Sequence, residues 1–301
     1  MKKILVTGSN GLLGQKLVYK LKDDKDVELI AVARGENRLV NRSGYEFVSV
    51  DLTESAAVKK LLLDKKPNVI INTAAMTNVD ACEQAKDECW KTNVKAVEYL
   101  IEGCEEIGAH LIHLSTDFVF DGEAGPYSEE DEPNPLHFYA ESKLASEKLL
   151  QESKIKWSIA RTIIVYGITD NMSRSNLVLW SKGALEKGQQ INVISDQFRS
   201  PTLAEDLADG CIAIALRGAL GIYHLSGPET HSIIELVYKV ADFYGLDKSY
   251  INPVTTDELN QPARRPLRTG FVIDKARKDL DYNPCNFDEG IKILDQQIKK
   301  F

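Results

Sequence analysis

Thr7-Gly8-Ser9-Asn10-Gly11-Leu12-Leu13-Gly14 is the stretch that decides the fold. It follows a short apolar run at 3–6 and begins a run with helical periodicity at 12–21, so a strand, a tight turn and a helix are expected in that order. In Gly8-x-x-Gly11-x-x-Gly14, the first glycine can turn the chain, the second can let a pyrophosphate approach the backbone, and the third can let the helix pack on the sheet. The helix N-terminus would then face the phosphates.

This glycine spacing differs from the Gly-x-Gly-x-x-Gly fingerprint, and glycines after a strand can also form an ordinary turn. The strand before the turn and the helix after it are the context that favours a nucleotide site. We therefore predict a dinucleotide cofactor at this turn. The residues predicted to bind it are Gly8, Asn10, Gly11, Leu12, Leu13 and Gly14.

Short apolar runs and helical stretches continue to alternate beyond this first unit. Strands are expected at 3–6, 28–33, 46–50, 69–73, 110–114 and 157–161, and helices at 12–21, 55–64, 87–106 and 139–152. Such alternation predicts an α/β fold, a Rossmann-like doubly wound parallel sheet with helices on both faces.

The pattern loosens after Gly167. Helices are expected at 176–187, 203–216, 232–244 and 288–299, strands at 191–194 and 221–225, and loops where prolines recur from 253 to 284. We assign 1–165 to a dinucleotide-binding Rossmann domain, which the chain is expected to rejoin by about 190–220. Residues 166–301 are assigned mainly to a smaller, mixed α/β substrate-binding lobe.

The composition narrows the class of protein. With 43% hydrophobic and 27% charged residues in 301, the chain is typical of a soluble globular protein. It has no apolar run of membrane-spanning length, and the run after Lys3 is too short for a signal peptide. A formal net charge of −8 disfavours a nucleic-acid surface. No membrane or nucleic-acid partner is expected.

The five cysteines, at 82, 89, 104, 211 and 285, are odd in number and irregularly spaced. They indicate free thiols in a reducing, cytoplasmic environment rather than a zinc site. We also expect no metal site, because no acidic cluster has suitable spacing. The sequence leaves the oligomeric state open, with a homodimer as one possible assembly.

Tyr139 and Lys143 are four residues apart in an expected helix, so their side chains share one face. The ammonium can favour the phenolate and also bind a cofactor ribose, which makes the phenol a usable acid or base. A Tyr-x-x-x-Lys pair alone is common on helix surfaces. Combined with the glycine turn and with Ser115-Thr116-Asp117 at a strand end, it indicates nicotinamide chemistry in which Thr116 holds a substrate carbonyl.

Arg34 stands at the end of the second expected strand, where an acidic residue would bind the free ribose hydroxyls of NAD. An arginine there can pair with a 2′-phosphate, which favours NADP, although a solvated surface arginine is the alternative. Asp51 and Leu52 follow the next strand and could border the adenine. Asp51 could equally cap the helix that follows.

Three longer motifs carry a family resemblance: Asn72-Thr73-Ala74-Ala75-Met76-Thr77-Asn78-Val79-Asp80, Ser115-Thr116-Asp117-Phe118-Val119-Phe120-Asp121-Gly122 and Asp196-Gln197-Phe198-Arg199-Ser200-Pro201-Thr202. With the glycine turn and Tyr-x-x-x-Lys, the chain resembles extended short-chain dehydrogenase/reductases over nearly its whole length, and among them dTDP-4-dehydrorhamnose reductases. This resemblance implies reduction of the C4 keto group of a nucleotide-linked 4-keto-6-deoxy sugar by NADPH, with NADH as the alternative. The first candidate is conversion of dTDP-4-dehydrorhamnose to dTDP-rhamnose.

The resemblance also implies roles for individual residues. Thr116 would bind the carbonyl oxygen, Tyr139 would supply the proton, and Lys143 would bind the nicotinamide ribose. Asn93 could organise the site through a backbone hydrogen bond or merely cap a helix. The remaining residues are those expected to contact ligands: Ala74 and Ala75 for the cofactor, Thr77, Val79 and Asp117 for the substrate, and Arg265 for its phosphates unless it forms only a surface salt bridge.

Two positions depart from the patterns of related enzymes. Phe118 stands where nucleotide-sugar dehydratases carry a glutamate, which favours reduction over dehydration. Reductases of the family commonly carry a tyrosine at Phe118 and a tryptophan at Ile164, so the exact sugar is less defined than the reaction. A nucleotide-sugar epimerase and a non-catalytic relative, like the regulatory subunit of methionine adenosyltransferase, are the alternatives. The complete Thr116, Tyr139 and Lys143 set favours catalysis.

Overall fold

A seven-stranded sheet forms the centre of the computed structural model, which describes residues 1–172 and 174–300. The strand order is β11-β6-β5-β4-β1-β2-β3, and each neighbouring pair is parallel. The strands are β1 (Lys2–Thr7), β2 (Val27–Ala33), β3 (Glu46–Ser49), β4 (Val69–Asn72), β5 (His110–Thr116), β6 (Lys156–Thr162) and β11 (Gly221–His224). This confirms the predicted doubly wound parallel sheet.

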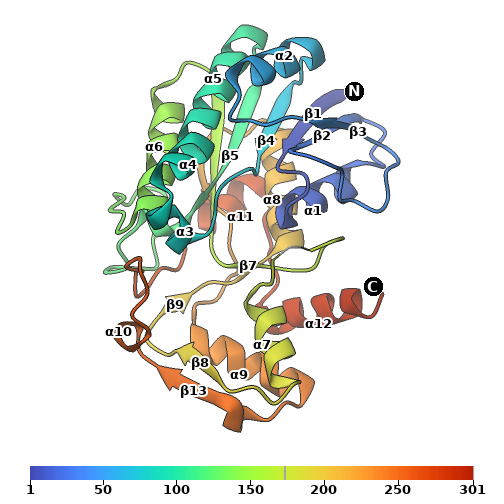
Figure 1. Cartoon of the computed structure of the whole chain (residues 1–301). Coiled ribbons are helices and arrows are strands. Elements are labelled where there is room, and N and C mark those ends of the chain that lie inside the picture. The colour runs from blue at the N-terminus through green and yellow to red at the C-terminus, as the bar shows by residue number, and fades with distance from the viewer. Residues whose placement is uncertain (173, 301) are drawn as a thin grey trace.

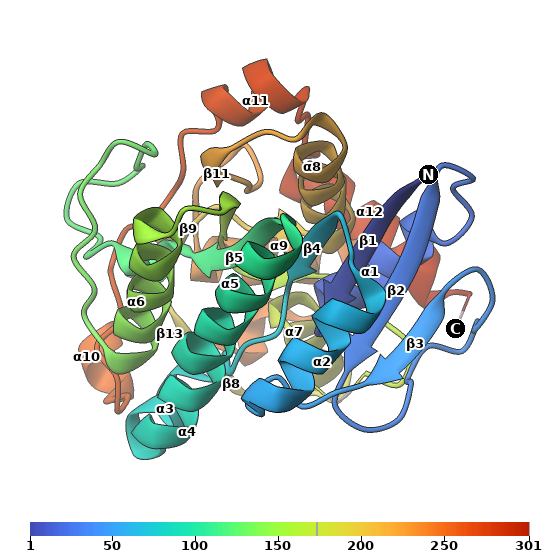
Figure 2. The ribbon, with the colours of Figure 1, turned by 90° about the horizontal axis from the view of Figure 1, so that it is seen from above.

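Helices cover both faces of the sheet (Figures 1 and 2). One face carries α1 (Leu12–Leu21), α8 (Ala204–Arg217) and α11 (Asp274–Leu280). The opposite face carries α2 (Ser55–Lys65), α5 (Ala96–Ile107) and α6 (Phe138–Glu152). The central strands are therefore buried on both sides, which explains why they are apolar at nearly every position.

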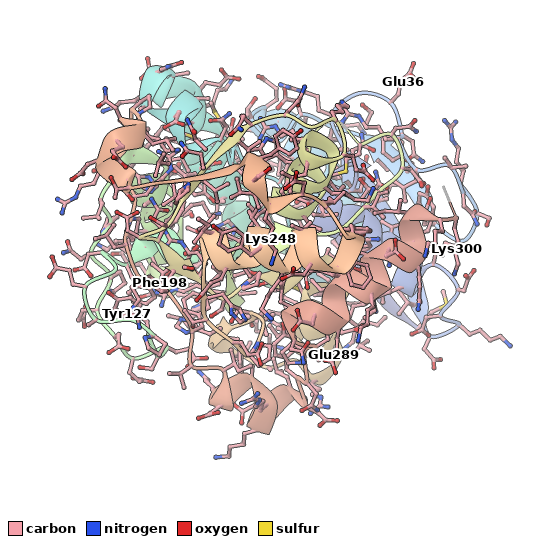
Figure 3. The ribbon with its side chains drawn as sticks, turned by 90° about the horizontal axis from the view of Figure 1, so that it is seen from below. Glu36, Tyr127, Phe198, Lys248, Glu289 and Lys300 are labelled. Carbon is pink, nitrogen blue, oxygen red and sulfur yellow. The ribbon has the colours of Figure 1, made fainter. Side chains whose placement is uncertain are left out.

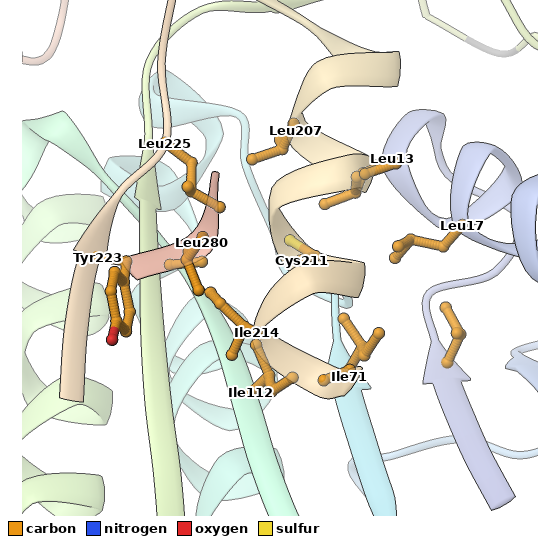
Figure 4. Close-up of a cluster of buried hydrophobic side chains, with 14 of the residues drawn as sticks. Leu13, Leu17, Ile71, Ile112, Leu207, Cys211, Ile214, Tyr223, Leu225 and Leu280 are labelled. Atoms are coloured by element: carbon orange, nitrogen blue, oxygen red, sulfur yellow. The ribbon is translucent and has the colours of Figure 1, made fainter. Parts of the chain in front are cut away.

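Successive strand residues enter two different apolar clusters, because side chains alternate across a strand. Ile71 packs with Leu17 and Ile214 on the face shown in Figure 4, whereas Ile70 packs on the opposite face. These side chains are almost completely buried. Each contributes about 1.5–3 kcal/mol relative to an exposed position.

The glycine turn joins β1 to α1. Gly8 has a φ of +64°, and its carbonyl oxygen accepts a hydrogen bond from Gly11 N at 2.8 Å. Gly11 is the N-cap of α1. A Cβ atom on Gly14 would lie 2.2 Å from Gly8 O, so only glycine lets the first turn of the helix approach the strand end this closely.

Below the sheet in Figure 1 lies a smaller group of elements, which we call the small lobe. Its helices are α7 (Leu177–Leu185), α9 (Ile233–Tyr244), α10 (Thr256–Leu259) and α12 (Phe287–Ile298). Its paired strands are β8 (Ile191–Ile194) with β13 (Ile251–Val254), β9 (Phe198–Arg199) with β12 (His231–Ser232), and β7 (Val165–Tyr166) with β10 (Thr202–Leu203). In the view from below, Lys248 lies in front of the middle of the small lobe, and Tyr127 and Phe198 lie toward one side (Figure 3).

The chain crosses between the sheet and the small lobe more than once. After β7 and α7 it returns through α8 and β11, and later through α11, which packs on α8 and β11. Sequence periodicity did not predict α11 or the two-residue strands, because such short elements carry little periodic signal. The division at residues 165 and 166 stays a prediction.

The helix expected at 87–106 is interrupted. It consists of α4 (Lys86–Trp90), a π-helical turn η1 (Lys91–Lys95) and α5, and is preceded by α3 (Val79–Gln84). Short 3₁₀ turns lie at η2 (Asp117–Val119) and η3 (Lys248–Tyr250). Among the residues described, no helix is both long and apolar enough to cross a membrane.

Gly14→Ala should destabilise the fold by about 1–3 kcal/mol, because the new methyl group overlaps the Gly8 carbonyl. Gly183→Ala in α7 is the matched control, since nothing lies within 4 Å of its Cβ position. That substitution should be neutral or stabilise by up to about 1 kcal/mol. Urea unfolding measures both. Equal stability of the two variants would contradict the close approach at Gly14.

Candidate active site

A cavity of ≈ 610 Å³ opens at the carboxyl ends of the central strands. From β1 the chain continues to β2 and β3 on one side of the sheet, whereas from β4 it continues to β5 and β6 on the other side. The cavity therefore lies at the point where doubly wound sheets bind ligands. Its size suits a cofactor or small-molecule site. The predicted site residues that line it are Asn10, Gly11, Leu12, Leu13, Ala75, Thr77, Val79, Thr116, Asp117, Tyr139 and Lys143.

Helix α6 supplies Tyr139 and Lys143. Its N-terminus is capped by His137, whose Nδ1 accepts a hydrogen bond from Ala140 N at 3.2 Å. Tyr139 and Lys143 then lie one turn apart on the face that meets the cavity, with only 8% and 2% of their surface exposed. The structure therefore brings the predicted pair together with the glycine turn.

Burial, rather than the neighbouring lysine, dominates the acidity of Tyr139. Desolvation raises the pKa of its phenol well above the usual value, the Asp117 carboxylate adds to the rise, and a hydrogen bond with Thr116 opposes it. The expected preference for phenolate is therefore not found. Tyr139 is protonated at neutral pH, as a proton donor must be before reaction.

Lys143 contacts a residue that sequence reasoning did not assign to the site. Its Nζ lies 2.8 Å from His113 Nε2, in the buried interior between β5 and α6. Burial lowers the pKa of Lys143 to about 8, although the nearby Glu147 carboxylate opposes this change. Burial also holds the pKa of His113 well below its usual value, so the imidazole is neutral.

Thr116 ends β5 beside the buried Asp117. The Thr116 hydroxyl donates to Asp117 Oδ1 at 3.1 Å and accepts from Phe118 N at 3.2 Å. The Asp117 carboxylate also accepts a hydrogen bond from Thr269 and lies 3.6 Å from Arg199 Nε. Burial raises the pKa of Asp117 despite this arginine. Asp117 borders the cavity, but its carboxylate joins the sheet to the small lobe.

On the cofactor side, Arg34 and Asp51 are neighbours. Arg34 is 78% exposed, and its Nη1 lies 3.6 Å from Asp51 Oδ2. Asp51 Oδ1 accepts from Thr53 N at 2.9 Å, and this hydrogen bond is the main reason that the pKa of Asp51 is lowered. The turn before α2 is therefore stabilised by Asp51. Leu52 packs against the apolar cluster beneath, and the adenine contacts of both residues stay predictions.

Gly8, Ala74 and Gly14 lie behind the cavity lining rather than in it. A Cβ atom on Gly8 would lie 2.8 Å from Ala74 N, so the glycine turn and the segment after β4 are in close backbone contact. Asn93 is buried, and its amide both accepts from Met76 N at 2.8 Å and donates to Met76 O at 3.1 Å. Asn93 thus holds the segment after β4 through hydrogen bonds to the Met76 backbone, and this was one of the two roles predicted for Asn93.

The substrate side contains an arginine that the sequence did not single out. Arg174 lines the cavity, and its Nη1 donates to Thr77 Oγ1 at 3.3 Å. The predicted Arg265 instead pairs with Asp80 at 2.8 Å and lies outside the lining. Its salt bridge was the alternative considered from the sequence, and a phosphate contact stays a prediction. Arg174 lies in a loop without a motif, so no sequence signal marked it.

Phe118 and Ile164 both line the cavity. The Phe118 ring packs edge-on against Tyr139, with ring centroids 6.5 Å apart. Ile164 has a φ of +32°, which is rare for a β-branched residue and marks a strained backbone. Such strain is often concentrated in binding sites, so the wall formed by Ile164 is a candidate determinant of specificity.

Comparison with known proteins gives one family match over almost the whole chain. The model of the family described as RmlD substrate binding domain matches residues 1–299. The chain is 30% identical to dTDP-4-dehydrorhamnose reductase from Aggregatibacter actinomycetemcomitans, covering 97% of this chain and 98% of the relative. It is 32% identical to methionine adenosyltransferase 2 subunit beta from Xenopus tropicalis, covering 92% and 82%.

A solved structure of dTDP-4-dehydrorhamnose reductase from Bacillus anthracis, in complex with NADP, has the same overall arrangement. The TM-score is 0.85 at 27% identity, with 99% of this chain and 100% of that chain covered. The similarity therefore includes both the sheet and the small lobe.

Lys143→Met should stabilise the folded protein by about 1–3 kcal/mol at pH 7, because a buried ammonium is replaced by an apolar chain of similar length. The folded pKa is depressed, so the cost of burying the charge is fully present below pH 8 and declines as pH rises toward the unfolded value. The gain should accordingly shrink at pH 10. Urea unfolding at both pH values tests this, with the exposed Lys148→Met as control. A variant less stable than wild type at pH 7 would contradict it.

Proposed function

Because the chain belongs to the RmlD substrate binding domain family, we propose that it reduces the C4 keto group of a nucleotide-linked 4-keto-6-deoxy sugar with NADPH. The first candidate substrate is dTDP-4-dehydrorhamnose, and the product would be dTDP-rhamnose. The observation that carries this proposal is that Thr116, Tyr139 and Lys143 line the same cavity as the glycine turn. A proton donor, a carbonyl-binding hydroxyl and a cofactor-binding turn are thus available in one site.

The residues present fit a dinucleotide. Gly8 and Gly14 place no side chain between β1, α1 and the segment after β4, because a Cβ atom on either glycine would overlap backbone atoms. The backbone at the N-terminus of α1 is therefore open to an anionic group. Gly11, Leu12 and Leu13 would bind the pyrophosphate, Ala75 and Lys143 the nicotinamide half, and Arg34 a 2′-phosphate. When bound, the cofactor supplies the hydride.

The residues of this chain would handle the proton and the developing charge. Thr116 would donate its hydroxyl hydrogen bond to the keto oxygen, exchanging its present contact with Asp117. Tyr139 would give its phenolic proton to the same oxygen as negative charge develops there. The Lys143 ammonium would then stabilise the phenolate that remains. Phe118 offers no carboxylate to assist loss of water, which supports reduction over dehydration.

A second candidate function is favoured by the relatives themselves. Methionine adenosyltransferase 2 subunit beta is, by its name, a subunit of another enzyme, and it is 32% identical to this chain. The second candidate is therefore a cofactor-binding subunit of a methionine adenosyltransferase. Binding of that enzyme's catalytic subunit, equal in wild type and in Tyr139→Phe, would favour it. Turnover of a keto sugar by the wild type favours the reductase.

Tyr139→Phe should lower turnover of dTDP-4-dehydrorhamnose by about 10²–10⁴-fold while NADPH binding is retained, because only the proton donor is lost. NADPH oxidation measured by absorbance is the assay. Tyr223→Phe is the control, since Tyr223 is buried and bonded to Asp279 outside the cavity. Full activity in Tyr139→Phe would overturn its role. If wild type binds NADPH without oxidising it, other 4-keto sugars should be tried before the second candidate.

Arg34→Asp should weaken NADPH more than NADH, by about tenfold or more, because a charge-assisted contact with the 2′-phosphate is replaced by repulsion. Arg277→Asp is the control, because it makes the same change in net charge on α11, which packs beside β11 at the far end of the sheet from β2. It should change neither affinity much. Fluorescence titration of the wild type and both variants with NADPH and NADH measures the six affinities. An unchanged NADPH to NADH preference in Arg34→Asp would make Arg34 a surface residue.

A further inference from the structure

A chain of buried hydrogen bonds runs behind the cavity and ends at Lys143. Thr7 Oγ1 lies 2.6 Å from the Asn72 amide, which lies 3.0 Å from His113 Nδ1. His113 Nε2 in turn lies 2.8 Å from Lys143 Nζ. Each of these four side chains is at least 98% buried, and they come from β1, β4, β5 and α6. The catalytic helix is therefore joined by polar contacts to β1, which leads into the cofactor turn, and to the neighbouring strand β4.

A neutral imidazole has one donor and one acceptor nitrogen, so it can serve either charge state of the lysine. If Lys143 is charged, His113 Nε2 must accept, and its proton lies on Nδ1, facing the Asn72 carbonyl oxygen. If Lys143 is neutral, His113 Nε2 donates, and Nδ1 accepts from the Asn72 amide nitrogen. The structure has this second orientation of the amide. Thr7 Oγ1 can form a hydrogen bond with either end of the amide, so the contacts from Thr7 to Lys143 can be made in both states.

No other group described around Lys143 can replace this partner. Glu147, one turn further along α6, is held by Arg161 at 2.6 Å. Cys89 approaches from α4, but its thiol is bonded to Ser142 and Asn93. Tyr139 lies on the cavity side, one turn before the lysine. Ser146 Oγ donates to Lys143 O and lies 3.0 Å from His113 Nε2, from which its oxygen can accept a hydrogen bond when that nitrogen carries the proton.

We propose that His113 is a positioning residue for Lys143, holding its Nζ in both charge states by changing tautomer as the Asn72 amide reorients between His113 and Thr7. The inference rests on the proposed function, in which charged Lys143 stabilises the phenolate of Tyr139. His113 touches neither the substrate nor the reacting atoms. It acts by keeping the lysine in place and by favouring its charged form, since a hydrogen bond to an ammonium is stronger than one to an amine.

The first test needs no substrate. Methionine and glutamine have nearly the same shape, but only glutamine can accept from or donate to Lys143. Protein labelled with ¹³C at lysine Cε would be titrated by NMR, and Lys143→Arg would identify the signal. His113→Met should lower the pH at which Lys143 titrates by about one unit, equivalent to a tenfold change. His113→Gln should stay close to wild type.

His110→Met is the matched control, because His110 lies on the same strand, is also buried and bonds to Ser158 instead. It should leave the Lys143 titration unchanged. His113→Asn gives a second test if the methionine variant does not fold, because its shorter amide does not reach Lys143 and should produce the same shift. An unchanged Lys143 titration in a folded His113→Met or His113→Asn variant would overturn the proposal.

The second test is the pH dependence of keto-sugar reduction. Turnover of the wild type should fall as pH rises through the pKa of about 8 for Lys143, because the ammonium is lost. In His113→Met this fall should occur about one pH unit lower, so kcat should drop by only about twofold at pH 7 but by about tenfold at pH 9, with little change in NADPH binding. A uniform loss at every pH would indicate a merely structural role. If the wild type reduces no keto sugar, the NMR result still decides the role of His113.

Discussion

The contact between the buried Asp117 carboxylate and the Arg199 guanidinium is the constraint on which the site depends. Both groups are almost fully buried, and separating them would leave charges without a partner in the interior. Arg199 also donates to the carbonyl oxygens of Leu267 and Pro266, so one side chain ties β9 and the loop before Thr269 to the end of β5. The end of β5, which lines the cavity, is thereby held to the small lobe, and Thr116 stands beside this junction.

Much of the sheet could be predicted from sequence because its strands are buried on both faces and its helices have one apolar side. The runs around Ile70 and Leu111 allow few other interpretations. Tyr139, Lys143 and Thr116 could also be predicted, because a helix face and a strand end follow from local spacing. The two-residue strands of the small lobe could not, since two residues have no period, and these strands form only where distant segments meet.

Contacts between side chains of different segments could not be predicted either, because they too form only where distant segments meet. Arg174 and Arg265 are both arginines in loops, and only the tertiary structure decides which faces the cavity and which pairs with Asp80. The acidity of Tyr139 shows the same limit. A lysine four residues away suggested a more acidic phenol, but the depth of burial has the opposite effect and is larger. His113 resembled an ordinary core residue until its neighbours were known.

The π-helical turn at Lys91–Lys95 has a consequence for how this chain can change during evolution. A π-helical turn is equivalent to one residue inserted into an α-helix, and here it lies where Asn93 brackets the backbone of Met76. Losing one residue would rotate everything on one side of the turn by about 100° relative to the other. The placement of the Met76 backbone therefore depends on the number of residues in this helix more than on their identity. Homologous chains should tolerate many exchanges in this helix but few changes in its length.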